Sequence, residues 1–320
     1  MFTSLLVLSS LALSYAAETS LPVTDWPGIK SAILEKAGQK SASLQPLAAP
    51  AADPVTPEGY QLAFGPLTAA TSAPGYMGFV FVPTYDVAAC ASLCNVRDFD
   101  EVGGRCQFFN IWEATVRATN ETTFTCALYY LSTNNSTATN IGDTTVSISD
   151  SRGYTRTSAV PNGSFESFTC TAPSGTCSAT SFGGWVGTSD DTTTGVLDTA
   201  TIVRDPALAH FGTSSISLGS LSGKTAASGT MTFRNIPTVK GRSYDLGFFH
   251  SSLVRNPTSA ADGAIVNVTW NGVVVETIAG ASNWTFHGRT VVAAGNDTLA
   301  FHGGKYPAYD SIDDVFLFLL

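Results

Sequence analysis

The C-terminal half of the chain alternates apolar and polar residues in short runs separated by Gly, Asn and Pro turns. A period of two residues is typical of β-strands, because successive side chains point to opposite faces of a sheet. The clearest expected strands are residues 243–249, 264–272, 273–278, 289–295, 297–304 and 311–319. Short strands at this spacing predict a β-sandwich over residues 159–320.

A different pattern marks residues 76–158, which hold four of the six cysteines. The stretch TYDVAACASLC predicts a short helix that has Asp86 as its N-cap and places Cys90 and Cys94 on one face. The stretches RCQFFNIW and TTFTCALYYL predict two strands, which carry Cys106 and Cys126. We therefore expect a small α+β module, stapled by disulfides, before the sandwich, in a chain that is mainly β.

The N-terminal part lacks this regular pattern. Residues 1–16 have an apolar run that ends in small residues and predict a signal peptide cleaved after Ala16. Residues 17–75 are rich in Ala and Pro, and we expect mainly a leader or spacer there. The stretch WPGIKSAILEKAGQK within it predicts one short amphipathic helix.

Composition agrees with export from the cell. Charged residues make up 13% of the chain and the net charge is -9, which argues against nucleic acid and anionic membranes as partners. An even number of cysteines in an exported chain favours disulfides, and residues 76–158 contain no His that would support a metal site. Glycosylation sequons begin at Asn120, Asn134, Asn135, Asn162, Asn267, Asn283 and Asn296.

The cysteine module resembles the PAN/apple-like modules, which share a helical C-x3-C, a cysteine before an aromatic strand and a C-x-L strand. The resemblance covers about 80 residues and implies the pairs Cys90–Cys126 and Cys94–Cys106. Periodicity alone does not choose among the three connectivities of four cysteines. We expect Cys170 and Cys177 to close a short loop in the next module. Apple-like modules bind proteins or sugars and are not catalytic.

The C-terminal module opens with NGSFE and closes with TLAFHGGKYPAYDSIDDV. In this order the motifs resemble the cenC-type carbohydrate-binding modules, which are galactose-binding-like jelly rolls, and related secreted bacterial and fungal domains. The resemblance implies a structural Ca²⁺ between the first and last strands, held by Glu166 and Asp313 with backbone carbonyls. The alternative is that both are edge acids in solvent or acceptors of backbone N–H bonds.

Sugar sites in such sandwiches combine aromatic faces with polar groups that fix the hydroxyls. In SYDLGFFHS we expect Tyr244 to face the core, whereas Asp245 and Phe249 face the other side, where the family has its groove. Trp270 and Trp284 are expected in the core. Each candidate has packing as its alternative role, and the candidate sugar-binding residues are Trp185, Asp245, Phe249, Tyr306 and Tyr309.

The sequence contains no recognisable catalytic motif, and its four histidines are too scattered for a zinc motif. We therefore predict no catalytic residues. The expected function is that of a secreted, non-catalytic glycoprotein, cell-wall associated or extracellular, that binds carbohydrate. One alternative is an adhesion or structural glycoprotein that binds a protein through the apple-like module. Another is an accessory part of glycoside hydrolysis.

Overall fold

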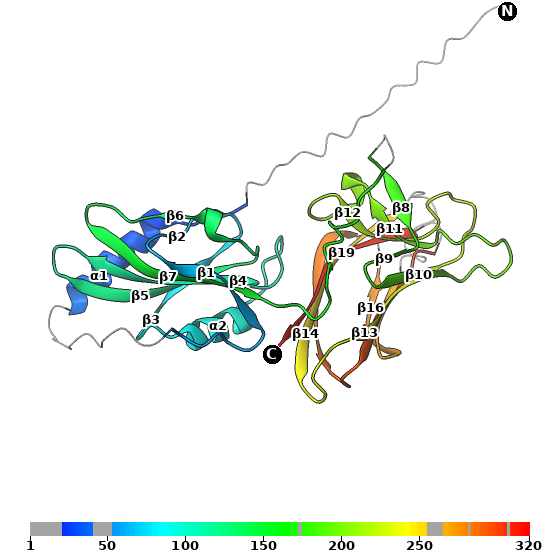
Figure 1. Cartoon of the computed structure of the whole chain (residues 1–320). Helices are drawn as coiled ribbons and strands as arrows, with labels where there is room; N and C mark the ends of the chain where they lie inside the picture. Colours follow the sequence, from blue (N-terminus) through cyan, green and yellow to red (C-terminus); the bar gives the residue numbers. More distant parts are fainter. Residues whose placement is uncertain (1–20, 41–52, 172–174, 255–264, 281, 306–307) are drawn as a thin grey trace, which may run out of the picture.

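The chain forms two modules that lie side by side (Figure 1). The computed structural model describes residues 21–40, 53–171, 175–254, 265–280, 282–305 and 308–320. The expected signal peptide and Tyr306 lie outside these residues. Among the described residues, no helix is long and apolar enough to cross a membrane.

The first module is a five-stranded antiparallel sheet in the order β1-β7-β4-β5-β3, with a helix on each face. A two-stranded ribbon, β2-β6, accompanies it. Its elements are α1 (Trp26–Lys40), β1 (Tyr60–Leu67), β2 (Ala70–Thr71), β3 (Tyr76–Val82), α2 (Val87–Val96), β4 (Phe108–Val116), β5 (Glu121–Tyr129), β6 (Ala138–Asn140) and β7 (Val146–Arg156).

Helix α2 is stapled to the sheet, as the sequence predicts. The Asp86 carboxylate caps the helix by accepting a hydrogen bond from the Ala89 N–H at 2.9 Å. The structure contains the pairs Cys90–Cys126 and Cys94–Cys106, and their sulfurs lie in a buried cluster with Val87, Phe109 and Ile111. The cysteines therefore join the helix to β5 and to the chain just before β4.

Helix α1 covers the opposite face, and this corrects the expectation of a spacer over residues 17–75. Ile29, Ile33 and Ala37 of α1 are buried against aromatic residues of β4 and β5. Strand β1 extends the sheet by pairing with β7. The sequence predicts the helix from its own periodicity, but the sheet face that needs covering lies far away in the chain.

The second module is a sandwich of two six-stranded antiparallel sheets. We call them the β18 sheet, β16-β15-β18-β13-β10-β9, and the β14 sheet, β17-β14-β19-β12-β11-β8. The strands are β8 (Cys177–Ala179), β9 (Ser181–Phe182), β10 (Trp185–Ser189), β11 (Ala200–Arg204), β12 (Ser214–Leu218), β13 (Gly229–Ile236), β14 (Ser243–Val254), β15 (Ile265–Trp270), β16 (Val273–Ala279), β17 (Ser282–Val292), β18 (Asp297–Gly303) and β19 (Ala308–Leu319).

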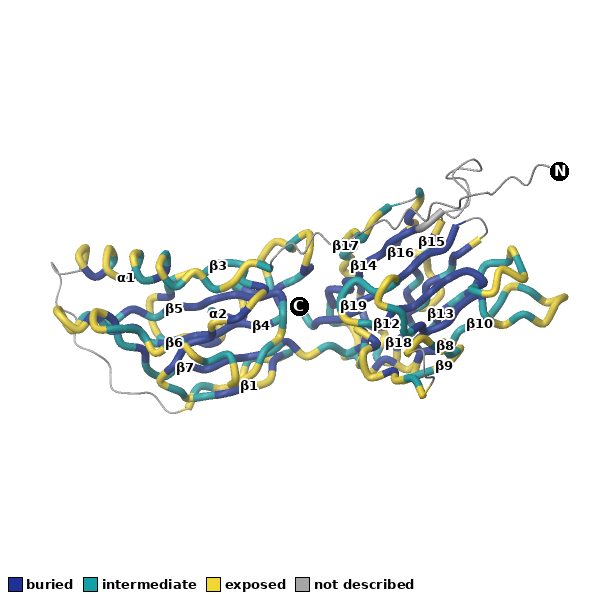
Figure 2. The backbone as a smooth tube through the Cα atoms, turned by 90° about the horizontal axis from the view of Figure 1, so that it is seen from above, coloured by how far each residue is buried: buried dark blue, intermediate teal, exposed yellow. Residues whose placement is uncertain are grey.

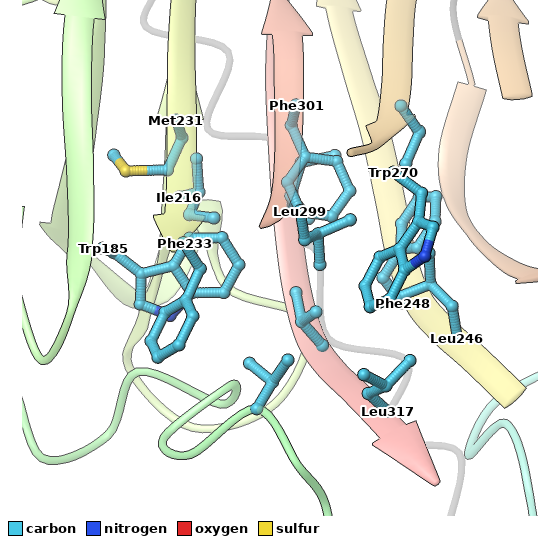
Figure 3. Packing of buried hydrophobic residues seen from close by; sticks show 14 of the residues in the cluster. Trp185, Ile216, Met231, Phe233, Leu246, Phe248, Trp270, Leu299, Phe301 and Leu317 are labelled. Carbon is cyan, nitrogen blue, oxygen red and sulfur yellow. The ribbon is translucent and has the colours of Figure 1, made fainter. Parts of the chain in front are cut away.

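The core of the sandwich lies between the two sheets (Figure 3). Trp185 and Phe233 of the β18 sheet pack with ring centroids 5.2 Å apart, and Leu246 and Phe248 enter from the β14 sheet. Trp270 is buried as expected, and its indole N–H donates to the Val292 carbonyl at 3.0 Å. Alternation along β14 and β15 therefore separates side chains that face the sandwich core from those on the outer face of each sheet, as the sequence predicts.

The modules meet over a short connection. The Thr157 N–H donates to the Gly59 carbonyl at 2.8 Å, and the Ala159 N–H donates to the Leu317 carbonyl at 2.9 Å. The connection is thus hydrogen-bonded to the first module at one end and to β19 at the other. Figure 2 shows buried backbone in the middle strands of both modules.

The packing of α1 predicts that Ile33→Ala lowers the free energy of unfolding by about 2–5 kcal/mol, because Ile33 is fully buried. Leu34→Ala is the matched control, since Leu34 is 38% exposed and should change stability by less than about 1 kcal/mol. Urea denaturation of both variants measures the difference. Equal effects would mean that α1 does not pack on the sheet in solution.

Candidate ligand site at the junction of the modules

The outer face of the β14 sheet carries a cluster of phenylalanines. Phe249 and Phe286 form a direct cross-strand pair of β14 and β17, with ring centroids 5.4 Å apart. Phe316 and Phe318 of β19 stack at 4.4 Å. All four rings are buried although they face away from the sandwich core, so something outside the sandwich covers them. We call these four residues the aromatic face.

The cover includes a loop of the first module, residues 97–105, between the paired cysteines Cys94 and Cys106. The Phe99 ring lies 5.0 Å from the Phe286 ring. At Gly104 an added Cβ would lie 3.0 Å from Phe286 and 3.3 Å from Phe249, and φ there is +72°. A residue with a side chain would therefore be both crowded and strained at this position.

Charge completes the contact between the modules. Arg105 Nε lies 3.0 Å from Asp245 Oδ2, and the Arg156 guanidinium lies over the Phe318 ring at 4.3 Å. Arg156 also donates to the Leu319 carbonyl at 3.2 Å. Burial raises the pKa of Asp245, and the two arginines offset part of that rise. The carboxylate thus joins the sandwich to the first module.

Next to the covered face lies a half-open group of rings that we call the aromatic corner: His210, Phe211 and Trp284. The His210 ring stacks on Phe249 at 3.7 Å. It lies 4.3 Å from the Phe211 ring and 5.4 Å from the Trp284 ring. Phe211 and Trp284 are half-buried, so parts of both rings face solvent. The Phe211 and Trp284 rings are tilted by 55° and 57° to the His210 ring. An exposed aromatic face with polar neighbours is the kind of surface on which a sugar ring stacks.

Two acids of the last strand hold the corner in place. Asp314 Oδ2 lies 2.8 Å from His210 Nδ1, and Asp313 Oδ2 accepts from the His210 N–H at 2.8 Å. Glu166 accepts from the Thr213 N–H at 2.7 Å and from the Ser214 N–H at 2.8 Å. Glu166 and Asp313 therefore both bind the loop of residues 210–214, although they come from the start and the end of the second module.

Both carboxylates accept backbone N–H hydrogen bonds, which is the alternative role that the sequence left open for them. Asp313 Oδ1 likewise accepts, from the Asp314 N–H at 2.7 Å. Within the described residues, no group of three or more His, Cys, Asp or Glu is gathered for a metal ion. Calcium at Glu166 and Asp313 stays a prediction.

The candidate sugar residues do not form one open surface. Trp185 lies in the sandwich core, which corrects its assignment to a binding surface. Asp245 and Phe249 lie on the expected outer face, but both are buried, with the first module's loop against them. Tyr309 is buried over Gly219, whose added Cβ would lie 2.8 Å from its ring. Trp185, Phe249 and Tyr309 therefore offer no open ring face.

Sequence reasoning missed the aromatic corner. It placed Trp284 in the core, whereas the structure has it half-buried against the aromatic face. Strand β17 begins at Ser282, seven residues before the expected strand at 289–295. The alternation of Trp284 with Phe286 on one side was the signal that could have placed both rings on the outer face.

The four histidines each lie beside a carboxylate. His250 pairs with Asp310 inside the sandwich at 2.9 Å, and both side chains are buried. The other three pairs are His210–Asp314, His287–Glu276 and His302–Asp190. His250 and Asp310 are therefore shielded from solvent.

Most of the sequon asparagines lie on the surface. Asn267 is half-buried on the outer face of the β18 sheet, opposite Thr277 and His302 on neighbouring strands. Asn162 is also half-buried. The exposed ones are Asn120, Asn134, Asn135, Asn283 and Asn296.

A third disulfide, Cys170–Cys177, closes the short loop that the sequence predicts.

Comparison with known proteins gives similarity at the level of structure. No protein-family model matches the chain, and no curated protein matches it. A CBM61 module solved with β-1,4-galactotriose is 15% identical with a TM-score of 0.33, over 51% of this chain and 99% of that one. A CBM4 structure is 12% identical, with a TM-score of 0.33 over 50% of this chain and 99% of that one. A sugar-binding protein described as putative, from Bacteroides thetaiotaomicron, is 13% identical, with a TM-score of 0.33 over 51% of this chain and all of that one.

The calcium prediction has a thermal readout. An ion that binds only the folded state raises the melting temperature. At a free concentration a hundredfold above its dissociation constant, it raises the free energy of unfolding by about 2.7 kcal/mol. Asp313→Ala should abolish this response, and Asp314→Asn should largely keep it. A melting temperature that ignores both calcium and chelator would leave the two carboxylates as acceptors of N–H bonds, as the structure has them.

Asp313 also predicts a pH dependence. Burial, and then the nearby Asp314 carboxylate, raises the pKa of Asp313 well above its ordinary value. The ionised carboxylate therefore costs the fold stability above that raised pKa, and the cost disappears as the pH falls below the ordinary Asp value. Between pH 7 and about 4, the melting temperature of the wild type should rise relative to that of Asp313→Asn. Parallel pH profiles of the two proteins would contradict this.

Proposed function

We propose that this protein is a secreted, non-catalytic glycoprotein that binds carbohydrate of a cell wall or extracellular polysaccharide. The ligand stacks on the aromatic corner, His210, Phe211 and Trp284. One observation carries the proposal: the Phe211 and Trp284 rings stay half-open on either side of a fixed His210 ring. The His210 ring is held by stacking on Phe249 and by the Asp314 carboxylate. Ring positions fixed before binding reduce the entropy lost when a ligand is ordered.

Polar groups beside the rings support a sugar rather than a purely apolar ligand. Asp314 lies against His210, and its side chain is 19% exposed. The Thr213 hydroxyl in the same loop bonds Glu166 at 2.9 Å. A sugar-binding site needs an aromatic face for the apolar side of the pyranose ring and polar groups for its hydroxyls. The aromatic corner and its polar neighbours supply both.

Three features support secretion. The chain begins with a signal-like apolar run, and its described cysteines form three disulfides. Exposed sequons lie on both modules, for example at Asn134 and Asn296. These features fit an oxidising, glycosylating route out of the cell. The sandwich similarity to sugar-binding structures is compatible with this role.

A second candidate function is adhesion to an extracellular protein through the first module. The observation that favours it is that three apolar side chains at the end of α2 and in the following loop are exposed: Val96 is 77% exposed, Phe99 49% and Val102 40%. Apolar side chains grouped on a surface are typical of protein contacts.

The direct test of sugar binding is a glycan array with the intact secreted protein and its variants. Trp284→Ala should weaken binding to the selected glycan at least tenfold, about 1.4 kcal/mol, because a stacking ring is lost. Val186→Ala is the matched control, since Val186 is 47% exposed on the opposite sheet. Equal losses in both variants, or full binding by Trp284→Ala, would contradict the assignment.

A further inference from the structure

The aromatic corner continues into the covered aromatic face. His210 stacks on Phe249 at 3.7 Å, and Phe249 pairs with Phe286 at 5.4 Å. The Phe99 ring of the first module then lies 5.0 Å beyond Phe286. One row of rings therefore runs from the open corner to beneath the loop of residues 97–105.

We propose that this loop is an intramolecular occupant of the sandwich's ligand face and competes with an incoming glycan for it. The inference rests on the proposed function, since it concerns the regulation of the same face. The wild-type chain then presents only the corner, and release of the loop exposes Phe286 and its neighbours for a longer contact.

The loop contacts the face in the way a ligand would. Phe99 supplies a ring against Phe286, as the apolar side of a sugar would. Gly104 lets the loop approach the face closely, since an added Cβ there would lie 3.0 Å from Phe286 and 3.3 Å from Phe249. Arg105 supplies the polar contact by pairing with Asp245 at 3.0 Å.

The same contacts mark the loop as releasable. Phe99 remains 49% exposed, so less than its full burial energy holds the loop in place. The Arg105 side chain that pairs with Asp245 is 27% exposed, so solvent weakens this ion pair. Interfaces between modules of one chain are commonly polar and permit relative motion.

The loop keeps its own shape when it leaves. The Asp100 N–H and carbonyl form two hydrogen bonds with Gly104, at 2.7 and 2.8 Å. The Asp100 carboxylate accepts from the N–H groups of Val102 and Gly103 at 2.8 and 2.9 Å. With Cys94–Cys106 closing its base, the loop is preorganised, and the short connection at residues 157–160 keeps its effective concentration high.

The test compares the wild type with Phe99→Ala/Arg105→Ala in the full chain, with bis-ANS fluorescence as a measure of exposed aromatic face and glycan affinity as the second readout. The double variant should bind more dye and hold the glycan at least about fivefold more tightly, because apparent affinity scales with the fraction of open face. Glu101→Gln, at an exposed polar position of the same loop, is the control and should change neither readout.

A second variant distinguishes release of the loop from misfolding of the double variant. Adding Asp245→Asn to the double variant removes the buried charge that loses its ion pair in Arg105→Ala. Unchanged dye binding in both variants overturns the inference, as does increased dye binding with unchanged or weaker glycan affinity. If neither wild type nor variants bind any glycan, the proposed function fails and the inference falls with it. A variant that binds glycan while the wild type does not supports both.

Discussion

The arrangement of the two modules depends on the need to cover an aromatic face that points away from the sandwich core. Phe249, Phe286, Phe316 and Phe318 lie on the outer side of the β14 sheet, where water would otherwise meet them. Burying such rings stabilises a protein by about 1.5–3 kcal/mol each, so a sheet with this face is poorly suited to stand alone. The first module supplies cover through one loop and two arginines.

This constraint explains why the open part of the face is small. Where the loop lies, Asp245 and Phe249 serve the contact between modules and do not meet solvent. Beyond the loop, the His210 ring covers Phe249, and Asp313 and Asp314 of the last strand hold His210 in place. Asp313, beside the apolar C-terminal run, fixes the ring-bearing loop by accepting the His210 N–H bond.

Sequence periodicity predicted what depends on local pattern. It placed α2 with its Asp86 cap and the alternation of β14 and β15, because each of these is set by neighbours a few residues apart. The pairs Cys90–Cys126 and Cys94–Cys106 join more distant residues, and they were implied by the resemblance to apple-like modules. It predicted the α1 helix but not its packing on the sheet, because that sheet begins twenty residues after the helix ends and extends to Arg156. Nor could it tell an outward ring in solvent from an outward ring under another module, which is why Phe249 was expected in an open groove.

The central claim is that Arg105 and Asp245 join the two modules across the aromatic face, and a double-mutant cycle tests it most directly. The free energy of unfolding would be measured for the wild type, Arg105→Ala, Asp245→Asn and the double variant. Contact across the junction predicts a coupling of about 0.5–3 kcal/mol between the two substitutions. Effects that add to within about 0.5 kcal/mol would mean that the two residues do not meet in solution, and would contradict the docking of the loop on the aromatic face.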